Sequence, residues 1–435
     1  MNFDEACEEA RKIAFSFSNP LIVHHYDADG ITSGSIVVSA FRKEFRNYRV
    51  KWIKKLDEHS FSKIKKEKEI IFVDLGSGNE IVDELKDVLV IDHHQPKELK
   101  KPQINPLLYG IDGGTELSSS GTAYSVFKNN IDLAIVGAVG DMQYPLIGKN
   151  REILEQGVKL NEITVEFDLR LYGRSSRPLP QFLSYSDEVY IPGITYNESN
   201  AYVFLQDLGL INEKNALNSY LDLTEDERAV LKKGLINHLI AKGYEQTAKY
   251  LIGEIYLLSR RPLRSGLYDA SEFSTILNAC GRHGMANIGV GVCLGEEEAY
   301  KKSLELLKYH KTKIREGLLF ARDNICDLGS FLFIDGRGVI DEGIIGIVCG
   351  MMLTQFDKKP LVGIAIGEEN TIKISTRANN SLISKGLNLG KSLSHSSKNI
   401  GGSGGGHKIA AGASIPKDKL EEFLLEFANF ISQSS

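Results

Sequence analysis

Three short apolar runs near the start of the chain constrain its fold more than any other feature. They cover residues 21–23, 70–73 and 88–91, and the segment after the first of them has helical periodicity. Such alternation indicates an α/β fold built on an open, mostly parallel sheet. Each run leads directly into ionisable residues, which are His24, His25, Asp27 and Asp29 after the first, Asp74 after the second, and Asp92, His93 and His94 after the third.

The carboxyl ends of parallel strands meet at one edge of a sheet, so these side chains are expected to converge there. Asp141 follows an apolar, helix-like segment and is expected at the same place. Four carboxylates in one cleft repel one another unless cations neutralise them. Mixed carboxylate and imidazole ligands favour two divalent cations, with Mn²⁺ preferred and Mg²⁺ as the alternative. Two such ions about 3.5–4 Å apart activate water and clamp a phosphoryl group.

Each of these residues also has a simpler interpretation. Asp27 and Asp29 could cap a helix or form a turn, and Asp141 could cap a helix. His93 and His94 could be a hydrogen-bonded pair in the core, and Asp74 could begin a tight turn. All of these explanations would have to place acids at one sheet edge by coincidence. The metal-site interpretation is therefore preferred.

Length and composition narrow the class of protein. A chain of 435 residues predicts two or three domains, and its five cysteines include no C-x-x-C pair, which argues against disulfides or a cysteine zinc site. The acidic, amphipathic N-terminal segment is unlike a secretory signal, and no apolar run is long enough to span a membrane. We therefore expect a cytoplasmic protein without membrane partners.

Composition shifts along the chain predict three domains. Residues 1–185 form the α/β domain with a linker, residues 186–327 a largely helical middle insertion, and residues 328–435 a C-terminal α+β domain. Within the first domain, the lysine-rich segment 51–69 is expected to be an exposed helix.

The C-terminal domain carries an uneven charge distribution despite the net charge of −5. Residues 370–417 contain seven lysines and arginines and no acid, which predicts a binding site for a polyanion, with a solvated surface as the alternative. The glycine-rich stretch Gly404, Gly405 and Gly406 could be a linker, but it precedes His407 and Lys408, and glycines allow close approach of backbone N–H groups to phosphate.

The motifs together resemble a known superfamily. The segments HHYDADGITSG, VDLGSG, VIDHHQP and GAVGDMQ resemble the four motifs of the DHH phosphoesterase superfamily. The segment GGSGGGHKIAAGAS is similar to the signature of its DHH-associated substrate-binding domain. The spacing and the middle region, through SDEVYIPGIT and TILNACGRHG, are most similar to archaeal RecJ-like exonucleases specific for single strands.

The resemblance implies a role for each residue. Asp27 and Asp29 would bind one metal each, Asp74 would bridge both, and His93 and Asp141 would complete the second site. A further ligand precedes Asp27, and we expect His25 rather than His24. His94 would contact the substrate phosphate and Asp92 would orient a histidine. The expected substrate-binding residues are Arg377, whose planar fork suits phosphate, and Gly404, Gly405, Gly406, His407 and Lys408.

The implied function is a metal-dependent exonuclease that hydrolyses single-stranded DNA or RNA to nucleoside monophosphates in DNA replication or repair. A replicative or repair helicase, or its accessory complex, is the expected protein partner. Two alternatives remain open at this point: a DHH phosphodiesterase of short oligonucleotides or cyclic dinucleotides, and a helicase-associated scaffold with vestigial activity.

Overall fold

A computed structural model describes residues 2–433 apart from residues 186–188, 213, 216, 354–357 and 369. The chain forms two compact units, Met1–Leu307 and Lys308–Ser435. Helix α13 (Glu297–Asn324) begins in the first unit and ends in the second. The division into three domains stays a prediction, and its boundary at residue 186 lies outside the described residues.

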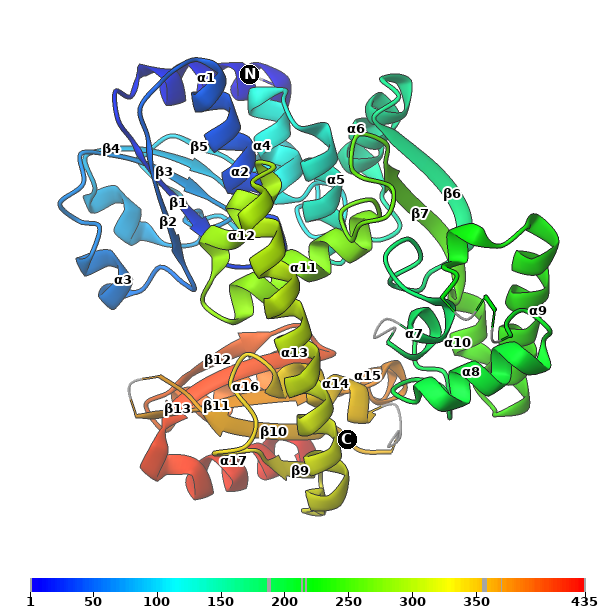
Figure 1. Cartoon of the computed structure of the whole chain (residues 1–435). Coiled ribbons are helices and arrows are strands. Elements are labelled where there is room, and N and C mark those ends of the chain that lie inside the picture. The colour runs from blue at the N-terminus through cyan, green and yellow to red at the C-terminus, as the bar shows by residue number, and fades with distance from the viewer. Residues whose placement is uncertain are drawn as a thin grey trace. The chain divides into compact units, whose positions relative to one another are not determined.

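A parallel five-stranded sheet of order β2-β1-β3-β4-β5 is the centre of the first unit (Figure 1). The three apolar runs form three of its strands, and the α/β prediction is confirmed. The strands are β1 (Leu21–His25), β2 (Arg49–Ile53), β3 (Glu69–Val73), β4 (Asp87–Ile91) and β5 (Gln103–Ile104).

Side chains alternate between the two faces of this sheet, as the two-residue period of a strand requires. Ile22 and Ile71 pack into a large core with helices, whereas Val23 and Phe72 pack into a smaller core on the other face. The helices of the large core include α1 (Phe3–Ser16), α2 (Ala28–Lys43), α4 (Ser119–Phe127) and α5 (Ile131–Gly140).

The predicted exposed helix over residues 51–69 is wrong for most of its length. Residues up to Ile53 belong to β2, which pairs in parallel with β1, and only α3 (Glu58–Ser62) is helical. The many lysines conceal a strand because β2 lies at the edge of the sheet, where charged residues are tolerated. Trp52 is half-buried and Ile53 is buried, which supplies the apolar contacts of the strand.

The middle region is largely helical, as predicted, and has its own core. Antiparallel strands β6 (Ile163–Leu169) and β7 (Ile252–Leu258) enclose it in the sequence. The helices between them are α7 (Leu179–Ser184), α8 (Glu198–Asp207), α9 (Glu225–Ala241) and α10 (Glu245–Tyr250). After β7 the chain returns to the first domain, where α11 (Ala270–Arg282) and α12 (Ala286–Cys293) join the large core.

The second unit is an α+β domain with a six-stranded sheet of order β12-β13-β11-β10-β9-β8. Helices α16 (Leu389–Lys398) and α17 (Leu420–Gln433) share one core with this sheet, and α14 (Ile345–Leu353) shares another. The strands are β8 (Cys326–Asp327), β9 (Leu332–Asp335), β10 (Leu361–Ile366), β11 (Thr371–Arg377), β12 (Ser403–Gly406) and β13 (Ala410–Pro416).

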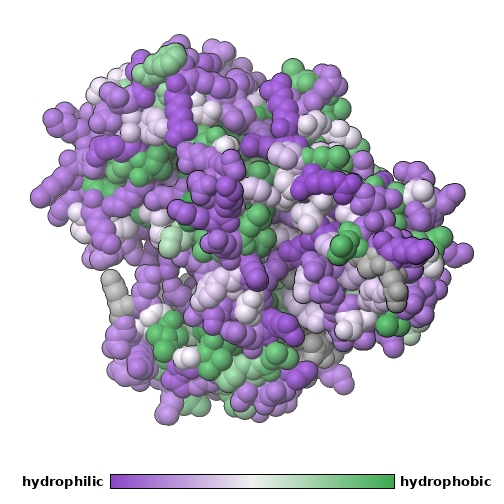
Figure 2. Space-filling view, viewed as in Figure 1, coloured by the Kyte–Doolittle hydropathy of each residue, from purple (hydrophilic) through white to green (hydrophobic). Residues whose placement is uncertain are grey.

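The surface seen in Figure 2 is mostly hydrophilic, with apolar residues in small groups. Among the described residues, none of the helices has both the length and the apolar character that crossing a membrane requires.

Candidate metal centre

The predicted ligands lie where the sheet topology places a binding crevice. In the order β2-β1-β3, the chain moves from β1 to one side and then returns to the other, and ligands bind at the carboxyl ends of strands around such a reversal. His25 ends β1, and Asp74 directly follows β3. Asp141 follows the last residue of α5.

Asp74 belongs to two groups of side chains whose ligand atoms lie within 4.8 Å of one another, one with His25 and Asp27 and the other with His93 and His94. Its Oδ2 lies 3.3 Å from His25 Nδ1, which in turn lies 2.9 Å from Asp27 Oδ2. Its Oδ1 lies 3.3 Å from His93 Nε2. The two oxygens of one carboxylate therefore face two different groups, which is the position that a bridging ligand requires.

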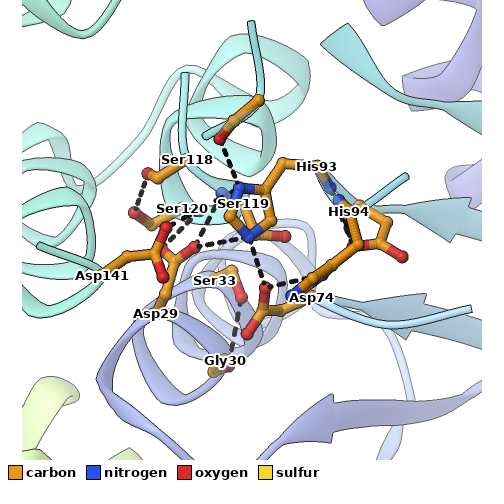
Figure 3. A network of polar contacts seen from close by, with 12 residues as sticks. Asp29, Gly30, Ser33, Asp74, His93, His94, Ser118, Ser119, Ser120 and Asp141 are labelled. Carbon is orange, nitrogen blue, oxygen red and sulfur yellow. Dashed lines mark hydrogen bonds and ion pairs between the residues drawn. The ribbon is translucent and has the colours of Figure 1, made fainter. Parts of the chain in front are cut away.

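A third group consists of Asp29, His93 and Asp141, and it shares His93 with the second. His93 Nε2 lies 3.8 Å from Asp29 Oδ2, and His93 Nδ1 lies 3.8 Å from Asp141 Oδ2. Figure 3 shows the His93 ring between Asp29 and Asp74. The structure thus brings together all six residues that the sequence predicts as ligands.

The donor set fits divalent cations. Three buried atoms, His25 Nδ1, His93 Nε2 and Asp74 Oδ1, form no hydrogen bond with the described residues although oppositely charged partners lie close by. Buried polar atoms normally form hydrogen bonds, so these atoms retain the capacity to bind a further ligand such as a cation. Asp74 also has a φ of 63°, a left-handed conformation that is uncommon for residues with a side chain. Carboxylate oxygens mixed with imidazole nitrogens suit Mn²⁺.

Hydrogen bonds fix the orientation of His93 and Asp141. The Nδ1 of His93 lies 2.7 Å from the carbonyl oxygen of Gly113 and must donate to it, which leaves Nε2 as the ligand atom. The same carbonyl accepts from Gln143 Nε2, which also donates to Asp141 Oδ2 over 2.9 Å. A side chain on Gly113 would meet the His93 carbonyl at 2.1 Å, so only glycine fits there.

Asp29 is held by the first turn of α4. Its carboxylate accepts hydrogen bonds from the backbone N–H groups of Ser119 and Ser120, at 2.7 and 2.9 Å. Helix N-termini favour negative charge, so α4 steadies Asp29 in the centre. Gly137 permits this approach, because a Cβ there would lie 2.5 Å from Asp29 Oδ1.

The two histidines before the loop point to different places. His24 is fully buried, its Nδ1 donates to the His25 carbonyl, and its ring packs against Gly34 of α2. Burial lowers the pKa of His24 to about 4. His25 lies in the ligand cluster, 2.9 Å from Asp27. The structure therefore places His25, and not His24, among the candidate ligands.

Asp92 lies outside the ligand groups and orients its neighbours. The ring of His94 donates from Nδ1 to Asp92 Oδ1 over 2.8 Å, and the backbone N–H of Ser77 donates to Asp92 Oδ2. Although burial opposes it, the contact with His94 lowers the pKa of Asp92 to about 2. The His94 side chain is 56% exposed, so its ring is accessible beside the cluster.

Protons compete with a cation for the candidate ligand groups, because several of their pKa values are raised. Burial and the Asp74 carboxylate raise the pKa of Asp29 to about 7. Burial, together with Asp74, also raises the pKa of Asp141 to about 6. Burial lowers the pKa values of His25 and His93, but the adjoining carboxylates outweigh it and raise them well above 6.5. Metal binding requires these ligands without their protons.

In the second unit, the glycine-rich segment forms the edge strand β12, which pairs with β13. Gly405, Gly406, His407 and Lys408 line a groove of about 680 Å³ with Lys391 and Lys398 of α16. Gly404 lies next to them in β12 and approaches Ser397 of α16. The described residues that line this groove include no acid.

Arg377 lies apart from that groove. It ends β11, its Nη1 donates to the Thr376 carbonyl, and its guanidinium lies over Gly346 of α14. The structure therefore brings together four of the six predicted substrate-binding residues around the groove, with Gly404 adjacent and Arg377 elsewhere in the unit.

Comparisons with known proteins agree with these motifs. Three family models match: the DHH family N-terminal domain over residues 19–144, the DHH-CID domain over residues 171–252, and the DHHA1 domain over residues 329–433. Uncharacterized protein MJ0831 of Methanocaldococcus jannaschii is 31% identical over 433 residues, with 95% of this chain and 93% of that protein covered. This chain belongs to the DHH family.

Two solved structures share the fold of this DHH protein. RecJ from Thermus thermophilus, in complex with Mn²⁺, matches with a TM-score of 0.61 and 17% identity over 99% of this chain and 55% of that RecJ. CDC45 from Entamoeba histolytica matches with a TM-score of 0.63 and 14% identity over 99% and 98% of the two chains. This DHH protein thus spans about half the length of the Thermus RecJ.

Sequence reasoning missed the helix that supports residues 26–29 of this DHH protein, a segment termed the metal loop. On α11, Asn278 Oδ1 accepts a hydrogen bond of 3.0 Å from the backbone N–H of Ala28, the residue between Asp27 and Asp29. Gly281 lies so close that a Cβ there would be 1.7 Å from the carbonyl oxygen of Tyr26. Both residues belong to TILNACGRHG, and this segment was the available signal.

Proposed function

We propose that this protein is a metal-dependent phosphodiesterase that acts as an exonuclease on single-stranded nucleic acid and releases nucleoside monophosphates. The observation that carries the proposal is the position of Asp74, whose two oxygens face two separate groups of ligands. Such a pair of sites serves phosphoryl transfer. A DHH protein with only a scaffold function has no need of this ligand set.

Each residue of the centre has a defined task in this proposal. His25 and Asp27 would hold one cation, Asp29, His93 and Asp141 the other, and Asp74 both. The cations would supply an activated water and neutralise charge on the phosphodiester. His94, held by Asp92 and exposed beside Asp74, would donate a hydrogen bond to the substrate phosphate.

The groove of the second unit supports a polyanionic substrate. Lys391, Lys398 and Lys408 supply positive charge, and the glycines of β12 allow the sugar-phosphate backbone of a nucleic acid to approach closely. A long single strand can place several phosphates along such a groove, whereas a dinucleotide has too few phosphates to make these contacts. Likeness in fold to RecJ and to CDC45 favours a role in DNA replication or repair, with a helicase or its accessory complex as a partner.

The test compares uniformly labelled single strands that are linear or covalently closed, with Mn²⁺ or with EDTA. We expect mononucleotides from linear strands only, no reaction in EDTA, and weaker binding as salt increases because phosphate contacts release counterions. Cleavage of circles would contradict an exonuclease. Faster hydrolysis of dinucleotides or cyclic dinucleotides than of long strands, insensitive to salt, would favour the small-substrate alternative.

A further inference from the structure

A second cleft in the first unit lies next to the turn that carries Asp141. It has a volume of about 350 Å³ and lies between the turn after α5, strands β6 and β7 with the residues that follow β6, and the start of α11. Its walls include the apolar or aromatic side chains of Val139, Met142, Leu171, Ile255, Tyr144 and Tyr256. Pockets of this size and composition bind small organic ligands.

Both acidic residues that line the cleft form ion pairs, but neither of them pairs with Arg170. Asp269 pairs with Arg174, Nε to Oδ2, at 3.2 Å. Glu254 pairs with Arg151 at 2.8 Å and accepts a hydrogen bond from Tyr256. The two arginines and two acids that line the cleft balance in charge, and Arg170 is the lining arginine without a carboxylate partner among the described residues.

The ring of Tyr144 holds Arg170 in place. The guanidinium carbon of Arg170 lies 3.6 Å from the centroid of that ring, a cation–π contact. Gly253 of β7 makes room for this pair, because a Cβ there would lie 2.1 Å from Tyr144 Oη and 2.8 Å from Arg170 Cδ. The contact positions the guanidinium while its N–H donors form no hydrogen bond with the described residues, so they are available to an anion.

The cleft shares its wall with the metal centre. Val139 and Met142, which line it, lie on either side of Asp141 in the sequence. The backbone of Met142 has a φ of 60°, and its side chain is 88% exposed at the cleft. Strained positions that expose apolar side chains are typical of ligand contacts.

We propose that this cleft binds one nucleoside 5′-monophosphate, with the phosphate on Arg170 and the base against the apolar and aromatic wall. The inference rests on the proposed function, because hydrolysis would produce this class of compound at Asp141, on the other side of the same turn. The volume of about 350 Å³ matches one nucleotide. The cleft is therefore a product-binding site that needs no metal.

The experiment measures binding of AMP and CMP to the full chain in EDTA by isothermal titration calorimetry. Arg170→Met removes the charge and keeps the apolar stem. Arg260→Met is the matched control, because Arg260 is an exposed arginine paired with Glu162 and does not line the cleft. We expect one site per chain, at least about tenfold weaker binding in Arg170→Met, and unchanged binding in Arg260→Met and in Asp74→Asn.

Three results would overturn the proposal: no binding at millimolar nucleotide, equal binding by Arg170→Met, or loss of binding in Asp74→Asn. Folding of Arg170→Met is checked by its Mn²⁺ affinity. If that variant does not fold, photolabelling of the wild type with 8-azido-AMP decides, because label outside the cleft walls contradicts the site. Nucleotide binding without hydrolysis of single strands would contradict only the proposed function. Hydrolysis without nucleotide binding would contradict only the product-binding site.

Discussion

Replacing Gly281 with alanine tests the support that α11 gives to the metal loop. Gly281 lies against the carbonyl oxygen of Tyr26, one residue before Asp27. A Cβ at position 281 would lie 1.7 Å from that oxygen, and real Cβ atoms do not approach closer than about 3.0 Å. The loop and the helix must therefore separate by about 1.3 Å in Gly281→Ala.

The size of this displacement sets the expected loss of rate and of stability. A shift of about 1 Å in catalytic geometry costs about 100-fold in rate, and overpacking of a core costs about 1–3 kcal/mol of stability. We expect Gly281→Ala to hydrolyse single strands about 100-fold more slowly or worse. We also expect weaker Mn²⁺ binding, because Asp27 and Asp29 move with the loop, while Asn278 loses its hydrogen bond to Ala28.

The assay combines hydrolysis of an end-labelled single strand with Mn²⁺ titration calorimetry and a thermal melt. Gly350→Ala is the control, because it adds the same methyl group to helix α14, where the nearest atom is Arg377 Nε at an ordinary 3.7 Å. The control should keep its Mn²⁺ affinity and melting temperature. Wild-type rate and metal affinity in Gly281→Ala would refute the idea that α11 positions the loop.

Three further predictions concern protons, the two histidines and the second unit. Because the pKa values of Asp29 and Asp141 are raised to about 7 and about 6, both are ionised at pH 8 and largely protonated at pH 5. Mn²⁺ affinity measured by calorimetry should therefore fall as the pH is lowered through this range, and a constant affinity would contradict the assignment. His25→Ala should lose Mn²⁺ affinity with little change in melting temperature, whereas His24→Ala should lower the melting temperature more than it lowers metal affinity, and the reverse pattern would exchange their roles. Arg377→Ala should raise the apparent KM about tenfold or more through loss of a phosphate contact worth about 1.5–3 kcal/mol, without changing Mn²⁺ affinity, and loss of metal would contradict separate binding and chemistry.

The strands of the central sheet could be predicted because strands buried on both faces are short, continuous apolar runs. The edge strand β2 could not, since Arg49 and Lys51 interrupt its apolar residues Val50, Trp52 and Ile53 and a lysine-rich segment follows it. The same physical rule therefore predicts the centre of a sheet better than its edge.

The convergence of the candidate ligands followed from chain topology, because residues after parallel strands meet at one edge. The orientation of the ligand side chains could not be predicted from this topology. The N–H groups of Ser119 and Ser120 that hold Asp29 come from a helix 90 residues further along the chain, and the Ala28 contact with Asn278 spans 250 residues. Such contacts leave no periodicity in the sequence. The preference for His25 over His24 came from the family resemblance, and the structure gives its physical reason: strand alternation directs His24 to the same face as Ile22.

The most direct test of the central claim is the activity and metal content of Asp74→Asn. This change keeps the size of the side chain and removes the charge that would bridge two cations. With wild-type protein, the account predicts two Mn²⁺ ions per chain and hydrolysis of linear single strands that stops in EDTA. With Asp74→Asn, it predicts a loss of bound Mn²⁺ and of nearly all hydrolysis. Full activity in Asp74→Asn, or wild-type activity in EDTA, would contradict it.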